Sequence, residues 1–101
     1  MAEKLYVYAI ATHGPASGMK GYQTITLMRL PAEEALRKAD LTAQILHESD
    51  DSKRNLLYDQ YEAIRGPLEA YVVREGQYQL GQVLDAVPAD AVPVDKFFKL
   101  G

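Results

Sequence analysis

The sequence predicts a single small α+β domain with two layers, in which an N-terminal antiparallel β-hairpin is packed by two or more α-helices. Two runs rich in β-branched and aromatic residues, 4–13 and 22–30, flank a loop that contains three glycines and a proline, as in a hairpin. Two segments with helical spacing of apolar residues follow. The order strand, strand, helix, helix differs from the alternation found in parallel sheets and therefore favours the α+β class.

Composition limits the class of protein. The chain has 101 residues, 48% hydrophobic and 25% charged, so residues 1–101 are expected to fold as one globular domain. The absence of cysteine excludes disulfides and thiolate chemistry. The first residues lack the pattern of a signal peptide and no window is apolar enough to span a bilayer, so we expect a cytoplasmic protein without membrane contact. A net charge of −3 without a basic cluster argues against direct contact with nucleic acid.

The predicted hairpin has two apolar faces. If Val7 lies opposite Leu27, one face is aliphatic and consists of Leu5, Val7, Ala9, Ala11, Ile25 and Leu27. The other face is rich in tyrosine, threonine and methionine and consists of Tyr6, Tyr8, Ile10, Thr12, Tyr22, Thr24, Thr26 and Met28. We expect the aliphatic face to pack against the helices. The tyrosine-rich face is then covered by helices as well, left as a solvated sheet surface, or used as a surface for a partner.

A helix is expected from about Pro31 to His47, because proline suits the first helical position and acidic residues follow in the first turn. Its predicted apolar stripe consists of Ala32, Ala35, Leu36, Ala39, Ala43 and Leu46. Residues 49–52 can each cap a second helix, whose apolar positions are Leu57, Tyr61 and Ile64. Gly66 is expected to end that helix in a left-handed conformation.

The remainder of the chain is less regular. Residues 67–80 fit either a short helix, which we favour, or a small hairpin that pairs Tyr71–Val73 with Tyr78–Leu80. Another short helical stretch is expected to include Leu80, Val83, Leu84 and Val87. Pro88 and Pro93 forbid a helix around them, so residues 85–101 are expected to form an extended C-terminal segment.

The loop between the predicted strands is the best candidate for a chemical site. It brings His13, Ser17 and Lys20 together with glycines, which suits an anion bound by backbone N–H groups or general acid–base chemistry. The spacing does not match a phosphate-binding loop, and neither histidine has a recognisable acidic partner. Residues 47–51 begin like a zinc-protease motif, but Asp51 stands where the second histidine is required. We therefore expect a flexible connection and assign no catalytic residue, metal ligand or cofactor.

These observations predict a small non-enzymatic protein-binding module, either an adaptor or an inhibitor that blocks a partner's surface. The expected partner-binding residues on the tyrosine-rich face are Tyr6, Tyr8, Tyr22 and Met28. The partner is either a second copy of the chain, giving a homodimer, or another protein. The alternatives are a small enzyme or anion-binding protein that uses His13, Ser17 and Lys20, and a nucleic-acid accessory protein.

Overall fold

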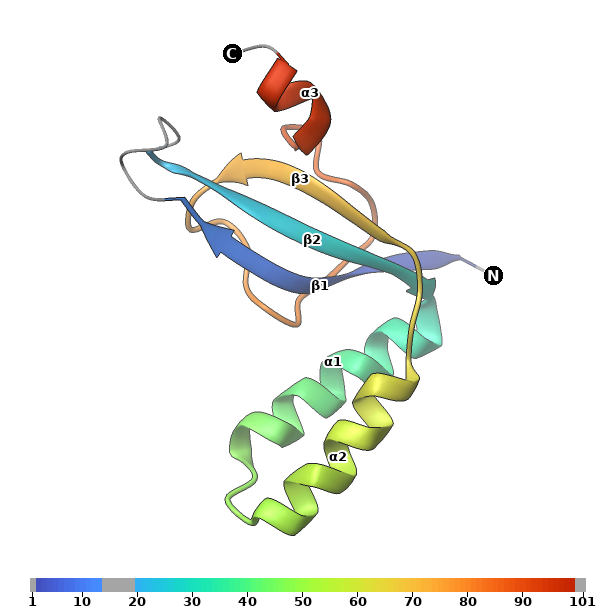
Figure 1. The fold of residues 1–101 in the computed structure, drawn as a ribbon. Helices are drawn as coiled ribbons and strands as arrows, with labels where there is room; N and C mark the ends of the chain where they lie inside the picture. Colours follow the sequence, from blue (N-terminus) through green and yellow to red (C-terminus); the bar gives the residue numbers. More distant parts are fainter. Residues whose placement is uncertain (1, 14–19, 100–101) are drawn as a thin grey trace.

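The computed structural model describes residues 2–13 and 20–99 (Figure 1). Its elements in chain order are β1 (Glu3–Thr12), β2 (Tyr22–Pro31), α1 (Ala32–His47), α2 (Asp51–Ala63), β3 (Leu68–Arg74), β4 (Val83–Leu84), β5 (Val92–Pro93) and α3 (Val94–Lys99). The five strands form one antiparallel sheet in the order β4-β1-β2-β3-β5, and α1 and α2 pack at one end of the sheet. The predicted α+β fold with an N-terminal hairpin is confirmed.

The register of the hairpin agrees with the sequence up to a bulge. Val7 lies opposite Leu27 as predicted, but the register shifts by one residue between Val7 and Ala9. Because side chains alternate between the faces of a strand, this bulge moves every later side chain of β1 to the other face. Ile10 therefore lies opposite Ile25 on the aliphatic face, whereas Ala9 and Ala11 join the face of Tyr6.

The helices cover the end of the tyrosine-rich face that holds Tyr6 and Met28, as one of the expected alternatives had it. Tyr6, Met28 and Leu30 pack beneath the helices against Ala35, Leu41 and Ile64. The hydroxyl of Tyr6 has a partner on α1, the Thr42 side chain, 2.5 Å away. A tyrosine can be fully buried when its hydroxyl is hydrogen-bonded.

The aliphatic face is covered by the chain that follows β3 rather than by the helices, so the expectation that it packs against the helices is wrong. The buried residues of that face are Leu5, Val7, Ile25, Leu27 and Val73. Residues from beyond β3 that pack on them are Tyr78, Leu84, Val87 and Ala91. The sheet thus has a hydrophobic core on each side, and the two-faced hairpin is covered largely by its own chain.

The buried side of α1 is rotated from the predicted stripe. Its buried residues are Ala35, Lys38, Leu41 and Ile45, whereas Leu36 and Leu46 are 55% and 74% exposed. The buried stripe includes Lys38. Because lysine is charged, the hydrophobic pattern of the sequence did not identify this stripe. In α2 the predicted cap is confirmed, because the Asp50 side chain accepts a hydrogen bond from the backbone N–H of Lys53 at 3.1 Å.

Residues 68–74 form a strand, so the helix favoured for 67–80 is wrong. The alternative hairpin is also wrong in its partner, because Tyr71 and Val72 pair with β2 and β5 rather than with residues 78–80. Gly66 was predicted to adopt a positive φ, but it does not. Instead, a Cβ atom there would lie 2.2 Å from the Arg29 carbonyl oxygen, so glycine permits the close approach that starts the β2–β3 pairing.

The last third of the chain also differs from expectation. Where a short helix was expected around residues 80–87, turns lead into β4, and the N–H of Val7 donates to the Gln82 carbonyl at 2.8 Å. Residues 85–91 contain no helix, as the prolines predicted, but Val94–Lys99 form α3 within the segment expected to be extended. β4 and β5 are each paired to the sheet through two residues.

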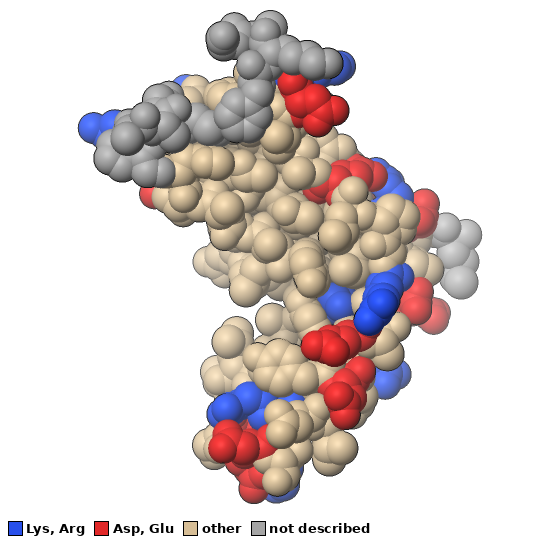
Figure 2. Space-filling view, in the orientation of Figure 1, with Lys and Arg blue, Asp and Glu red and all other residues tan. Residues whose placement is uncertain are grey.

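The molecule is elongated. Its extents are 45 × 34 × 18 Å and its radius of gyration is 15.0 Å, against about 13 Å for a compact chain of this length. The α1–α2 hairpin extends away from the sheet, and Figure 2 shows a waist where the two meet. No helix within the described residues is long and apolar enough to cross a membrane.

Candidate functional site

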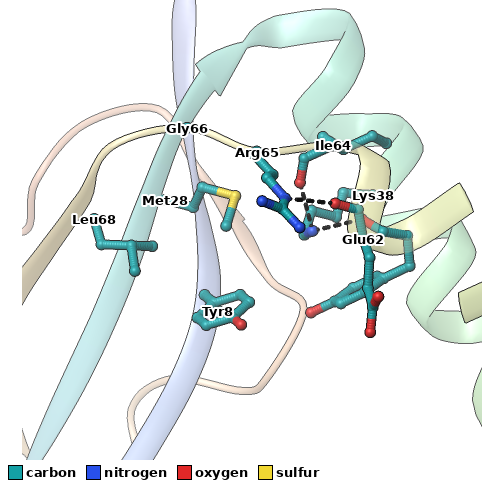
Figure 3. Close-up of a pocket in the computed structure, with 9 residues that line it drawn as sticks. Tyr8, Met28, Lys38, Glu62, Ile64, Arg65, Gly66 and Leu68 are labelled. Atoms are coloured by element: carbon teal, nitrogen blue, oxygen red, sulfur yellow. Dashed lines mark hydrogen bonds between the residues drawn. The ribbon is translucent and has the colours of Figure 1, made fainter. Parts of the chain in front are cut away.

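A cavity of about 420 Å³ lies at the waist, between the sheet and the C-terminal end of α2 (Figure 3). The sheet contributes Tyr8, Met28 and Leu68. The helices and the connection to β3 contribute Lys38, Tyr61, Glu62, Ile64, Arg65 and Gly66. This volume is within the range of small-molecule sites, and the lining combines apolar surface with a few charged and hydroxyl groups.

Lys38 is the most unusual residue of this site because it is 1% exposed. Its Nζ donates hydrogen bonds of 2.7 Å to the carbonyl oxygens of Tyr61 and Ile64. These carbonyls lie at the end of α2, where the helix dipole favours a cation. The same Nζ lies 3.7 Å from the centroid of the Tyr61 ring. Lys38 thereby joins α1 to the last turn of α2.

The charge of Lys38 has no carboxylate partner among the described residues. The ion pairs found there are Lys4–Asp85, Arg29–Glu69 and Arg54–Asp51. Burial lowers the pKa of Lys38, and the nearby Arg65 lowers it further, whereas Glu62 acts in the opposite direction. The ammonium group is therefore held by carbonyl dipoles and an aromatic face rather than by an opposite charge.

Hydroxyl groups form a second layer behind the lysine. The hydroxyls of Tyr6 and Tyr61 are 3.4 Å apart, and Thr42 Oγ1 donates to the Lys38 carbonyl at 2.9 Å. The rings of Tyr6 and Tyr61 pack edge to face, with centroids 6.3 Å apart. Burial, together with the contact with Tyr6, raises the pKa of Tyr61. Tyr61 is therefore a neutral hydroxyl at physiological pH.

The four predicted partner-binding residues do not share one exposed surface. Tyr6 and Met28 are 0% and 5% exposed in the core beneath the helices. Tyr8 is 39% exposed and lines the cavity. Tyr22 is half-buried at the far end of β2, where its ring lies 5.7 Å from that of Phe97. Only Tyr8 of this set offers a largely accessible side chain near the cavity.

The predicted loop site is described only in part. His13 Nε2 lies 2.7 Å from Thr24 Oγ1, so the imidazole is hydrogen-bonded to the neighbouring strand. Lys20 is exposed, and Ser17 lies outside the described residues. A catalytic or anion-binding role for His13, Ser17 and Lys20 stays a prediction. Across 2–13 and 20–99, no cluster of three or more histidine and acidic side chains is placed to hold a metal ion.

The outer edge of β1 is the second notable surface. β4 pairs only with Leu5 and Tyr6, and Val7 exchanges backbone hydrogen bonds with Gly81 and Gln82. No described residue pairs with the outer edge of residues 8–12, which carry neither charge nor proline. Backbone groups of successive strand residues point alternately toward β2 and away from it, and those of Val7 point away. Counted through the bulge, the N–H and C=O groups of Ile10 and Thr12 also point away from β2. Such an edge is a template for another strand.

Sequence reasoning missed the cavity because its lining comes from five separate segments. One signal was available. Lys38 continues the spacing of Ala35, Leu41 and Ile45, so a lysine occupies a position on the buried face of a helix. The other cation, Arg65, follows α2 without any local pattern that marks it.

Comparison of the chain with protein-family models, with curated proteins and with solved structures finds no match. Function is therefore inferred from the geometry of this molecule.

Proposed function

We propose that this chain is a small non-enzymatic protein-binding module that pairs through the outer edge of β1, residues 8–12, with an extended strand of a partner. The observation that carries the proposal is the uncharged edge beyond Val7, with which no residue in the described part of the chain pairs. An added strand satisfies the outward N–H and C=O groups with main-chain hydrogen bonds. The contact suits an adaptor, or an inhibitor that covers a partner's surface, and the cytoplasmic location stays a prediction.

A second copy of the chain is the first partner to test. Antiparallel pairing of two β1 edges across a two-fold axis would join the two sheets into one. The absence of charge in residues 8–12 avoids repulsion between identical edges. Tyr8, 39% exposed beside the edge, adds an aromatic ring that can pack across the interface.

The test is the mass in solution, measured by light scattering over a concentration series, of the natural chain and two variants. Thr12→Lys places a charge on the exposed edge, and we expect it to weaken the dimer by about tenfold or more. Asn55→Lys adds the same charge on the exposed surface of α2 and is expected to leave the dimer unchanged.

A dimer equally stable in both variants would show that the β1 edge is not the interface. A monomer at every concentration would exclude a second copy as the partner. In that case, a photo-cross-linking residue is placed at position 12 in one sample and at position 55 in another, and both are irradiated in cell extract. Adducts found only at position 12 would indicate a different protein as the partner. If position 12 forms no adduct beyond those of position 55, the proposed function is wrong.

A further inference from the structure

The cavity at the waist has an excess of positive charge. Its charged lining residues are Lys38, Arg65 and Glu62. Arg65 does not neutralise Glu62 through its carboxylate, since its Nε donates to the Glu62 backbone carbonyl at 3.1 Å. Figure 3 shows the Arg65 side chain extending toward Lys38 from the connection between α2 and β3. Two cations thus converge on one hollow.

The buried cation creates a demand for an anion. A charged group removed from water is costly unless it is paired, and the end of a helix supplies only about half of a negative charge. Lys38 has two carbonyl oxygens and an aromatic ring around its ammonium group but no carboxylate among the described residues. Repulsion from Arg65 adds to this imbalance. An anion between the two side chains would relieve both effects.

The apolar and aromatic lining residues of the cavity indicate which chemical group carries the anion. Met28, Ile64 and Leu68 provide apolar surface, and Tyr8 and Tyr61 provide aromatic rings. An inorganic ion would leave these walls uncovered. A ligand with an apolar body would cover the exposed side chains among them, Tyr8 and Leu68, and gain free energy from that burial. A volume of about 420 Å³ accommodates a ring or a short aliphatic chain.

We propose that this cavity binds a small organic carboxylate, with its charged end between Lys38 and Arg65 and its apolar body against Tyr8, Met28 and Leu68. The site shares Tyr8 with the proposed pairing edge, but its two cations, Lys38 and Arg65, take no part in strand pairing, so each proposal can fail without the other. The carboxylate can belong to a free metabolite-sized acid or to the C-terminal residue of a peptide, since both present the same group to the two cations.

The test is an NMR titration of the isotope-labelled chain with phenylacetate, followed at the rings of Tyr8 and Tyr61 and at the side chain of Lys38. Phenylacetamide, which is of similar shape but neutral, is the matched ligand. We expect saturable shifts with phenylacetate, at least tenfold weaker binding of phenylacetamide, and a rise in the pKa of Lys38 when the acid binds.

Two variants test whether phenylacetate binding depends on the positive charge of Arg65. Arg65→Gln removes an exposed cation from the cavity and is expected to weaken phenylacetate binding by about tenfold. Arg37→Gln removes the same charge from an exposed position on α1, where the guanidinium contacts Gln60, and is expected to have no effect. Both sites are exposed, so the fold is expected to survive either change.

The proposal is overturned by the absence of saturable shifts, by equal binding of phenylacetate and phenylacetamide, or by equal effects of the two arginine variants. Two peptides ending in phenylalanine, one with a free carboxylate and one amidated, identify the source. Tighter binding of the free-carboxylate peptide than of phenylacetate assigns the site to a protein terminus. Tighter binding of phenylacetate assigns it to a small molecule.

Discussion

Three polar side chains on the sheet hold β2 against β3. Arg29 donates to both carboxylate oxygens of Glu69, at 2.9 and 3.2 Å, and the Tyr71 hydroxyl donates to one of them at 2.7 Å. The hydrogen bonds from Arg29 and Tyr71 lower the pKa of Glu69, and Arg29 has the larger effect. The carboxylate is thus favoured in its charged form in the folded state.

The pKa of Glu69 leads to a prediction for acid stability. Because its folded pKa is below the usual 4.5, its contribution is present above the unfolded pKa and is lost as the pH falls through the folded pKa. Glu69→Gln is expected to lower the free energy of unfolding near pH 7 by about 0.5–1 kcal/mol, since the pair is partly exposed.

Urea unfolding of both proteins from about pH 7 to about pH 3 measures this difference. The curves are expected to converge as the pH falls, because the natural chain loses the contribution that the variant lacks. Glu75→Gln, at an exposed glutamate in a turn, is the control. A constant difference between the natural chain and Glu69→Gln across this range would assign the loss to packing instead.

At the level of single residues, sequence reasoning succeeded where the pattern is local. The alternation along β1 and β2 was enough to place Val7 opposite Leu27. It could not identify the bulge at Tyr8, nor show that Tyr6 is buried. The partner of Tyr6 is Thr42, which lies far along the chain on α1. A hydroxyl that is satisfied only by the folded structure leaves no local signal.

Among the structural elements, the start of β3 depends on one glycine. A methyl group at Gly66 would lie 2.2 Å from the Arg29 carbonyl oxygen and 2.9 Å from Leu30 Cδ2. Gly66→Ala is therefore expected to separate β3 from β2 locally and to cost about 2–3 kcal/mol of stability, measured by denaturant unfolding.

Gly76→Ala provides the comparison for Gly66→Ala. Gly76 has a φ of +86° but no atom near the position of an added Cβ. Its substitution is expected to cost about 1 kcal/mol, from backbone conformation alone. If Gly66→Ala is no more destabilising than Gly76→Ala, the backbone at Gly66 can move away from Arg29 at little cost.

Helices and strands were predictable to the extent that their partners are near in sequence. The hairpin, α1 and α2 were predicted close to their observed limits because each has its own pattern or cap. β3 was not, because Tyr71–Val73 fit either a helix or a strand until pairing with the distant β2 decides. The cavity at the waist could not be predicted for the same reason, since Lys38 lies far along the chain from the other two charged lining residues, Glu62 and Arg65.

For the whole molecule, stability is expected to be uneven. Most of the fully buried side chains lie in the sheet, whereas α2 has no buried residue and lies in the hairpin that extends from the sheet. Backbone amides in α2 are therefore expected to exchange with solvent at least tenfold faster than those in β2, through local opening. Hydrogen exchange measured residue by residue tests this difference.

The end of α2 is expected to be its most protected part, because Lys38 holds the carbonyls of Tyr61 and Ile64. Protection in α2 equal to that in β2 would mean that the helical hairpin opens only when the entire domain unfolds. In that case the helices and the sheet would form a single cooperative unit despite the waist between them.

The cover of the aliphatic face has a consequence during protein synthesis. Leu5, Val7, Ile25 and Leu27 leave the ribosome well before the residues that shield them, which lie between Tyr78 and Ala91. A growing chain can form the hairpin early, yet its aliphatic surface stays uncovered until residues 78–91 have been synthesised. The order of synthesis therefore leaves an apolar strand surface exposed on the nascent chain, and this core can close only after residues 78–91 have followed the hairpin.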